Sequence, residues 1–105
     1  MTIINEQFTV NTEGNTDIID ITKQVQNFVY QKGLKDALVC VSIQGSTSAV
    51  TTIEYEPGLI KDLREALERV APSGQEYHHD EIWHDGNGYA HIRSALMGSS
   101  VCVDL

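Results

Sequence analysis

The residues best suited to chemistry are the histidines, and all four of them lie between His78 and His91. Acidic and amide side chains are interleaved with them, namely Asp80, Glu81, Asp85 and Asn87. Imidazole, carboxylate and carboxamide groups bind divalent metals and carry protons near neutral pH, and packing alone gives no reason to concentrate them. The stretch 78–91 therefore predicts a polar site.

Three of the histidines are predicted to be nitrogen ligands to one divalent metal ion: His79, His84 and His91. Three protein ligands leave a coordination position open for water or substrate, which is the catalytic rather than the structural pattern. His78 is the expected exception, because adjacent residues on an extended chain point to opposite sides. Three carboxylates are either direct ligands or outer acceptors that fix the imidazole tautomer: Asp80, Glu81 and Asp85.

The spacing of these histidines matches neither a zinc finger nor the HExxH helix motif. The alternative to a metal site is a solvated, histidine-rich loop that holds no ligand. Three imidazoles suit zinc, iron, nickel or copper, and cellular supply decides among them. We expect a divalent ion, with zinc as the first candidate.

A second candidate site is the small, hydroxyl-rich turn Ser46-Thr47-Ser48, which follows Gly45 directly after a predicted strand. Such a turn can direct N–H and hydroxyl groups at phosphate oxygens, and it is no Walker loop because no Gly-Lys-Ser/Thr ending is present. A plain hairpin turn is the alternative. Arg93 is the cation expected nearest to the histidines, with an ordinary surface arginine as its alternative.

Composition limits the partners. The formal charge of −8, with only seven Lys and Arg residues, argues against nucleic acid, which needs clustered positive charge. No apolar run is long enough for a membrane span. Residues 1–6 lack the basic start and apolar run of a secretory signal, so cytoplasmic residence is expected, and Cys40 and Cys102 are expected to be reduced thiols.

The elements that must position these residues alternate between strand and helix. β-Formers predict strands over 3–10, 37–43, 49–55 and 99–105. Helical periodicity predicts three helices: one capped by Asp20 and stopped by Gly33, one that begins at Pro57 and ends before Pro72, and one over 90–97 closed by Gly98. The histidine-rich stretch before the last helix is expected to be a loop, and no linker or repeat divides the chain.

Several ordered motifs resemble the YjbQ family, over a match that runs from about Ile18 to the end. They are the run 45–58, Tyr77-His78-His79-Asp80, the segment 83–88 (Trp-His-Asp-Gly-Asn-Gly) and the run 90–100. The resemblance implies an α+β fold of two packed, mostly antiparallel sheets with two main helices and one short helix, assembled as a homotrimer. It also implies a polar site near a subunit boundary, in which His79, Asp80 and His91 match widely shared positions and His84 belongs to a variant motif.

The chain departs from this family pattern after residue 103. Members continue with a glycine turn, a Gly-Thr-Trp-Gln motif and final strands, which do not follow here. We therefore expect residues 1–105 to form a single YjbQ-like domain that is shortened at its C-terminus and lacks those strands; the alternative is that its closing strands come from elsewhere. A sheet without them would have an exposed edge that favours association.

The activity implied by the resemblance is that of a secondary thiamine-phosphate synthase, which couples a pyrimidine diphosphate to a thiazole phosphate with release of pyrophosphate. The residues expected to act in catalysis are His91, Arg93 and Asp80, and those expected to bind the small phosphorylated molecule are Ser46, Thr47, Ser48 and Asn87. A metal on the three histidines would neutralise the departing diphosphate. The alternatives are a non-catalytic trimeric metal- or anion-binding module and a metal-assisted phosphate-ester hydrolase.

Overall fold

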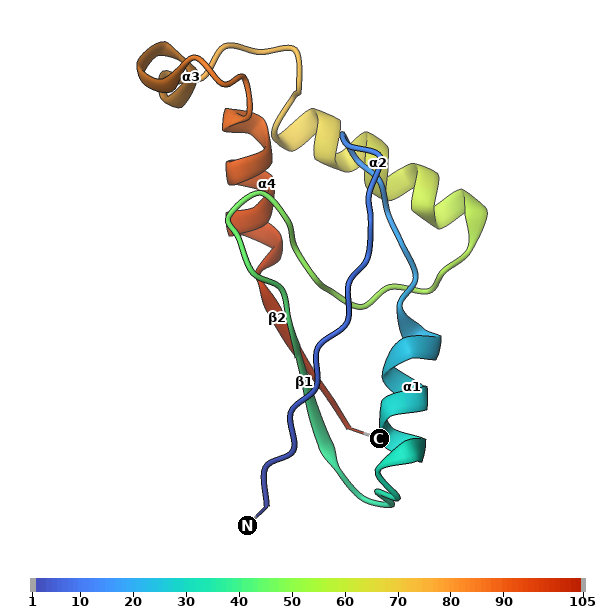
Figure 1. Ribbon diagram of the computed structural model, residues 1–105. Coiled ribbons are helices and arrows are strands. Elements are labelled where there is room, and N and C mark those ends of the chain that lie inside the picture. Colours follow the sequence, from blue (N-terminus) through green and yellow to red (C-terminus); the bar gives the residue numbers. More distant parts are fainter. Residues whose placement is uncertain (1, 105) are drawn as a thin grey trace. The chain divides into compact units, whose positions relative to one another are not determined.

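A computed structural model describes residues 2–104, so Met1 and the last residue of the predicted strand 99–105, Leu105, lie outside it. The element order is α1 (Thr22–Gln31), β1 (Leu38–Ser42), α2 (Pro57–Val70), α3 (His78–Trp83), α4 (Gly88–Met97) and β2 (Ser100–Asp104) (Figure 1). The chain divides into two compact units, one up to Ala37 and one from Leu38 on. Within residues 2–104, every helix is too short or too polar to cross a membrane.

The first unit contains α1, as the sequence predicted. Asp20 Oδ1 accepts a hydrogen bond from the Thr22 amide (2.9 Å) and another from the Thr22 hydroxyl, and these two bonds lower the pKa of the Asp20 carboxyl. At the other end Gly33 adopts a positive φ of 66°, which glycine takes without a Cβ penalty and which turns the chain out of the helix.

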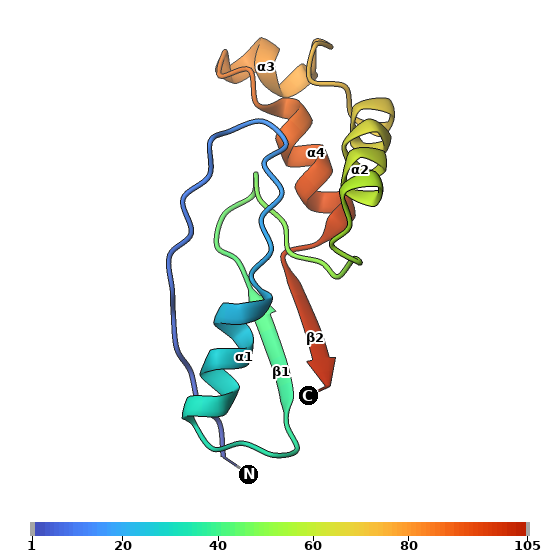
Figure 2. The same cartoon turned by 90° about the vertical axis from the view of Figure 1, so that its right-hand side faces the viewer.

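The second unit is built on the antiparallel pair β1 and β2, which run side by side in both ribbon views (Figures 1 and 2). Val39 is buried opposite Val103, whereas Cys40 is exposed opposite Cys102. This alternation is the period of a sheet with one covered face. The predicted strands over 37–43 and 99–105 are confirmed, and so is the α+β class.

Two other predicted strands, 3–10 and 49–55, do not form. Residues 2–104 therefore contain a single two-stranded sheet in place of the two packed sheets that were expected. Both segments are rich in β-formers, but a strand exists only where a neighbour satisfies its N–H and C=O groups. In segment 49–55, Val50 N donates to Gly98 O (3.2 Å), but this bond is not part of a strand pairing.

Helix α2 starts as expected with Pro57 in its first turn, and the Glu56 carboxylate accepts from the amides of Gly58 and Leu59, both at 2.8 Å. These two bonds lower the pKa of Glu56, so the carboxylate acts as a helix cap. Ile60 is the buried residue of this helix.

The predicted histidine-rich loop is instead partly helical. Residues 78–83 form α3, which ends because His84 adopts a left-handed conformation (φ 58°) while its amide still donates to Asp80 O at 2.9 Å. Histidine tolerates this region better than β-branched residues do. Helix α4 follows after a short turn, and the two helices contact each other.

Candidate metal and substrate site

The junction of α3 and α4 is held by Gly88 and Asp80. Gly88 is buried against Tyr77 so closely that a Cβ at this position would lie 2.5 Å from Tyr77 Cβ and 2.9 Å from Tyr77 Cγ. Asp80 Oδ1 accepts from the Gly88 amide at 3.0 Å. Because that amide is in the first turn of α4, the carboxylate satisfies one of the helix's unpaired donors and fixes where α4 begins relative to α3.

Three possible ligand residues, His79, Asp80 and Asp85, gather at this junction. One nitrogen or oxygen atom from each lies within 4.8 Å of the others. Within this group His79 Nε2 lies 3.1 Å from Asp85 Oδ1, close enough to form a hydrogen-bonded pair. The side chains of His79 and Asp85 are 33% and 43% exposed, so the group is open to solvent and to a dissolved ion.

Asn87 adds a fourth polar group. It immediately precedes α4, yet its side chain makes no capping hydrogen bond to the helix. The amide of Gly88 donates to Asp80 instead. With its amide nitrogen turned to the cluster, Asn87 donates to Asp85 Oδ1 at 2.9 Å and lies 3.0 Å from His79 Nε2. The opposite orientation would set the carboxamide oxygen against acceptors only, so hydrogen bonding favours the orientation with the amide nitrogen toward Asp85.

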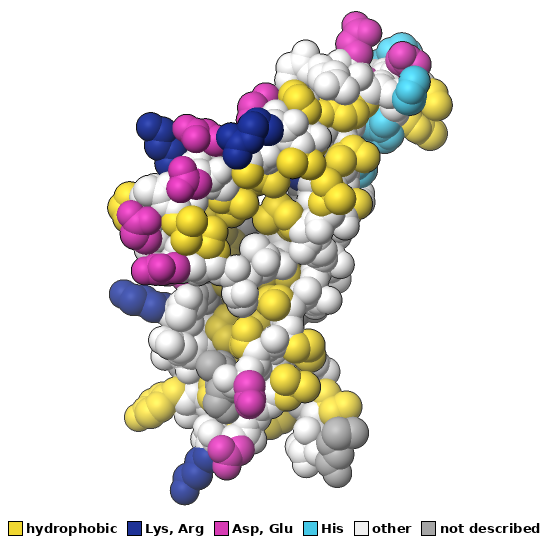
Figure 3. All heavy atoms as spheres, turned by 180° about the vertical axis from the view of Figure 1, so that it is seen from behind, with side chains coloured by type: hydrophobic (Ala, Val, Ile, Leu, Met, Phe, Trp, Pro, Cys, Tyr) yellow, Lys and Arg dark blue, Asp and Glu magenta, His cyan; other side chains and the backbone are white. Residues whose placement is uncertain are grey.

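His91 lies one turn further along α4, and its ring is next to that of His79, with 4.6 Å between the centroids and 58° between the planes. Figure 3 shows histidine side chains gathered beside acidic ones on this part of the surface. The arrangement brings two imidazoles, two carboxylates and one carboxamide together from 79–91.

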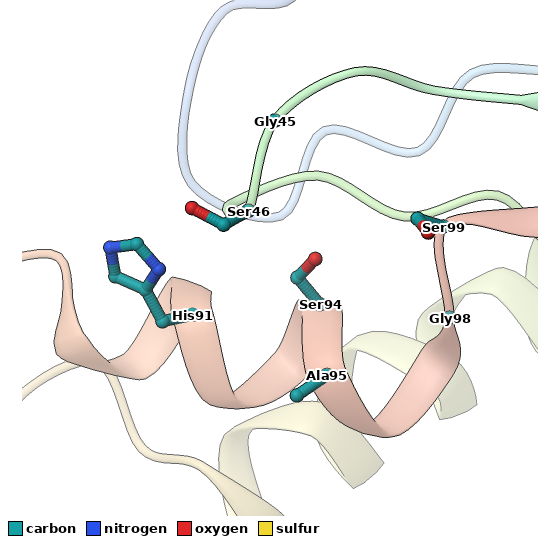
Figure 4. Close-up of a pocket in the computed structure, with 7 residues that line it drawn as sticks. All are labelled: Gly45, Ser46, His91, Ser94, Ala95, Gly98 and Ser99. Atoms are coloured by element: carbon teal, nitrogen blue, oxygen red, sulfur yellow. The ribbon is translucent and has the colours of Figure 1, made fainter.

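An open pocket with a volume of about 440 Å³ begins at His91 and continues along α4. Its wall on one side is the turn at Gly45 and Ser46, and on the other it is α4 and the residues that follow, Ser94, Ala95, Gly98 and Ser99. The Ser46 hydroxyl and the His91 ring face the same space (Figure 4). This volume is within the range of small-molecule sites.

The turn that forms this wall is tied to α4 and its end at three points. Ser94 Oγ donates to Ser48 O, Ile43 N donates to Ser99 O (2.9 Å) and Val50 N donates to Gly98 O (3.2 Å). Ser46 of this turn and His91 thus line the same pocket. Ser48 contributes its carbonyl oxygen to these contacts, and Thr47 is not one of the residues that line the pocket.

The predicted ligand set His79, His84 and His91 is not brought together as one group. Within residues 2–104, the group of three acid or histidine ligands that converges is His79, Asp80 and Asp85, and His84 instead ends α3. His78, expected to point away, is 99% exposed and lies 3.5 Å from Glu81.

Arg93 is buried, with 7% of its surface exposed, and joins α4 to the end of α2. Its Nε donates to Ala71 O at 3.0 Å, a terminal nitrogen lies 2.8 Å from Glu68 Oε2, and the guanidinium carbon is 4.9 Å from the centre of the Tyr89 ring. The Ser73 amide chiefly lowers the pKa of Glu68, with Arg93 contributing. These contacts give Arg93 a structural role and do not support the predicted role in neutralising phosphate.

Sequence reasoning missed two contributors to the site. Ser94 is buried on α4 and holds the turn, and Tyr77 packs on Gly88. Gly88 was the sequence feature that could have indicated the packing of Tyr77, because a glycine at the start of a helix suggests that another group approaches closely.

The fold and site define an α+β protein with a histidine–carboxylate cluster at a helix junction and a pocket beside it. A family model described as "UPF0047 protein YjbQ-like" matches residues 6–105, so this chain belongs to the YjbQ/UPF0047 family. The predicted family membership is confirmed.

Among curated proteins, a UPF0047 protein of Archaeoglobus fulgidus is 38% identical over 97 residues, which cover 92% of this chain and 73% of the relative. UPF0047 protein YugU of Bacillus subtilis is 27% identical over 93 residues, and the aligned region covers 87% of this chain and 67% of YugU.

Solved structures agree with the fold. A YbjQ-like protein of unknown function from Sulfolobus solfataricus superposes with a TM-score of 0.80 at 25% identity, over 88% of this chain and 66% of that one. A YjbQ/UPF0047 protein from Clostridium acetobutylicum gives a TM-score of 0.74 at 33% identity, over 88% and 70%. The chain thus spans about two thirds of the length of these solved relatives.

Proposed function

We propose that this protein binds a divalent metal ion through His79, Asp85 and Asn87, with Asp80 and His91 at the edge of the site. Ligand atoms that share an ion at about 2.1 Å lie roughly 3.0–3.4 Å from one another in octahedral or tetrahedral shells. The 3.1 Å between His79 Nε2 and Asp85 Oδ1 and the 2.9 and 3.0 Å from these atoms to the Asn87 carboxamide agree with that spacing.

The two orientations of Asn87 suit the two states of such a site. Without an ion, the amide N–H groups satisfy the Asp85 carboxylate. With an ion between them, the carboxamide oxygen would turn toward it and become a third ligand atom beside the imidazole nitrogen and the carboxylate oxygen. The mixed nitrogen and oxygen set suits zinc, and also manganese or iron(II).

The observation that carries the proposed function is that His91 belongs both to the cluster and to the pocket. Its ring contacts His79 on α3 and also lines the cavity opposite Ser46. A small phosphorylated molecule in that cavity would therefore have its phosphate next to His91 and the Ser46 hydroxyl, close to the ion. The turn 45–48 supplies further N–H and hydroxyl donors to such an anion.

For the reaction, we propose the activity that the family resemblance implies: a pyrimidine diphosphate and a thiazole phosphate give thiamine phosphate and pyrophosphate. When bound, the ion supplies positive charge to the departing diphosphate. His91 would hold or donate a proton to a phosphate oxygen, and Ser46 would orient that phosphate. Asp80, with Oδ1 committed to Gly88, would position α4 and the ligands rather than transfer a proton.

The experiment is an assay for thiamine phosphate with both substrates, with and without added zinc or manganese. We expect metal-dependent product that falls at least about 100-fold in His91→Ala, while His78→Ala, whose ring is exposed, retains activity. Phosphate release from one substrate alone would favour the hydrolase. Metal binding without any turnover would favour the non-catalytic module.

We also propose that the chain acts as a homotrimer, as the resemblance implies. The support is the number of large apolar side chains left exposed in the second unit, including Ile82 (69%), Trp83 (68%) and Leu96 (65%). Exposed apolar surface of this kind marks association sites in soluble proteins. Light scattering coupled to gel filtration should give the mass of three chains, and the mass of one chain would contradict the proposal.

A further inference from the structure

Cys40 on β1 and Cys102 on β2 are direct cross-strand partners. The phase of the ladder is fixed by the bond from Ile43 N to Ser99 O, which makes that pair a hydrogen-bonded one. Antiparallel pairs alternate between hydrogen-bonded and non-hydrogen-bonded types, so counting three residues along each strand makes Cys40 and Cys102 a non-hydrogen-bonded pair.

This type of pair brings the two side chains closest. Its Cα atoms are about 4.5 Å apart, which is inside the roughly 4.4–6.8 Å that disulfides span. Hydrogen bonding with Cys40 is the largest of the effects that raise the pKa of Cys102, which agrees with the adjacency that the register gives the two side chains. Both cysteines are exposed, and a dissolved oxidant can reach them.

We propose that Cys40 and Cys102 are a redox modification site that forms a reversible cross-strand disulfide by exchange with a low-molecular-weight disulfide. One thiolate attacks the small disulfide, one small thiol leaves, and the other cysteine then displaces the second small thiol as the protein S–S bond forms. The protein thiols lose two electrons and two protons, and the small disulfide gains them as two thiols.

The position of the bridge gives it a consequence for the pocket. β1 leads directly into the turn at Gly45 and Ser46, and β2 follows directly from Gly98 and Ser99, so both walls of the pocket continue from the bridged strands. The bridge would close a covalent loop around residues 41–101 and restrain the separation of these walls. This inference is independent of the metal site and of the proposed reaction.

The test is incubation of the purified full chain with a series of oxidised-to-reduced glutathione ratios, followed by thiol titration and peptide mapping without reduction. We expect both thiols to be lost together, a Cys40–Cys102 linked peptide within single chains, and full recovery with dithiothreitol. Two glutathione adducts per chain, bridges only between chains, or two thiols that persist under oxidising ratios would overturn the proposal.

A matched control moves one thiol along the same exposed face. The double variant Cys40→Ser/Ser42→Cys keeps two exposed cysteines but makes them diagonal neighbours, about 7–8 Å apart. We expect it to take up glutathione instead of forming the intrachain bridge. An equally efficient bridge in this variant would show that the register does not select the pair, and that result also contradicts the proposal.

Discussion

The rings of His79 and His91 lie 4.6 Å apart although they come from different helices, α3 and α4. Their contact depends on the tight junction at Gly88 and on the bond from the Gly88 amide to Asp80. It joins a cluster of metal-ligand side chains to a pocket of small-molecule size.

Asp85→Asn should weaken zinc binding by about 10- to 100-fold, because a neutral carboxamide replaces the carboxylate that lies nearest to His79. Isothermal titration calorimetry with zinc measures the change. Glu81→Gln is the matched control. This substitution removes the same charge from the same segment, but the Glu81 side chain pairs with the exposed His78 and not with His79. Equal losses in the two variants would mean that general charge, and not the cluster, attracts the ion.

Gly88→Ala should destabilise the protein by about 1–3 kcal/mol, because the added methyl group overlaps the Tyr77 side chain and forces α3 and α4 apart. Urea unfolding followed by circular dichroism gives the free energy of unfolding. Gly74→Ala serves as the control, since nothing lies within 4 Å of a Cβ there, and it should change stability by less than about 0.5 kcal/mol. Comparable stability in both variants would refute the close-packing explanation.

Arg93→Lys should cost about 2–4 kcal/mol of stability, because one ammonium group cannot replace both the bond to Ala71 O and the pair with Glu68 in a buried setting. Thermal and urea unfolding measure this loss. Arg69→Lys in the exposed last turn of α2 is the comparison and should be nearly neutral, because it keeps the positive charge. If Arg93→Lys left stability unchanged but abolished substrate binding, the predicted phosphate role of Arg93 would be restored.

The cap at Glu56 should make stability depend on pH. Its pKa is lowered in the folded state by the Gly58 and Leu59 amides, so its contribution is complete above the ordinary glutamate pKa and is lost as the pH falls through the lower, folded value. Glu56→Gln should therefore lower Tm at pH 7 and have a progressively smaller effect below about pH 4. Calorimetric scans from pH 7 to pH 3 test this, with Glu54→Gln as the control. A constant Tm difference over that range would contradict the cap.

The sequence predicted the elements whose signals are local. Asp20, Gly33, Pro57 and Gly98 mark helix ends by capping or backbone preference, and each helix they bound is present. The segments 3–10 and 49–55 have equally good β composition, but pairing depends on a second strand that no local pattern specifies.

The convergence of the candidate site residues is likewise a tertiary property. The clustering of histidines marked the segment in which His79, Asp80 and Asp85 come together, whereas the placement of Ser46 and His91 beside one pocket depends on contacts between distant parts of the chain. Which ligands converge depends on the direction of each side chain from α3 and on the turn at His84, which the sequence does not specify. The burial of Arg93 against the end of α2 was not predicted, because it depends on a tertiary contact with Ala71, which lies 22 residues earlier in the sequence.

The most direct measurement is an anomalous difference map at the zinc absorption edge, from crystals of the full chain grown with zinc and phosphate. The account predicts a peak within bonding distance of His79 Nε2 and Asp85, with Asn87 turned to present its oxygen, and phosphate density between His91 and Ser46. A zinc peak at another location, or an empty cluster at saturating zinc, would contradict it.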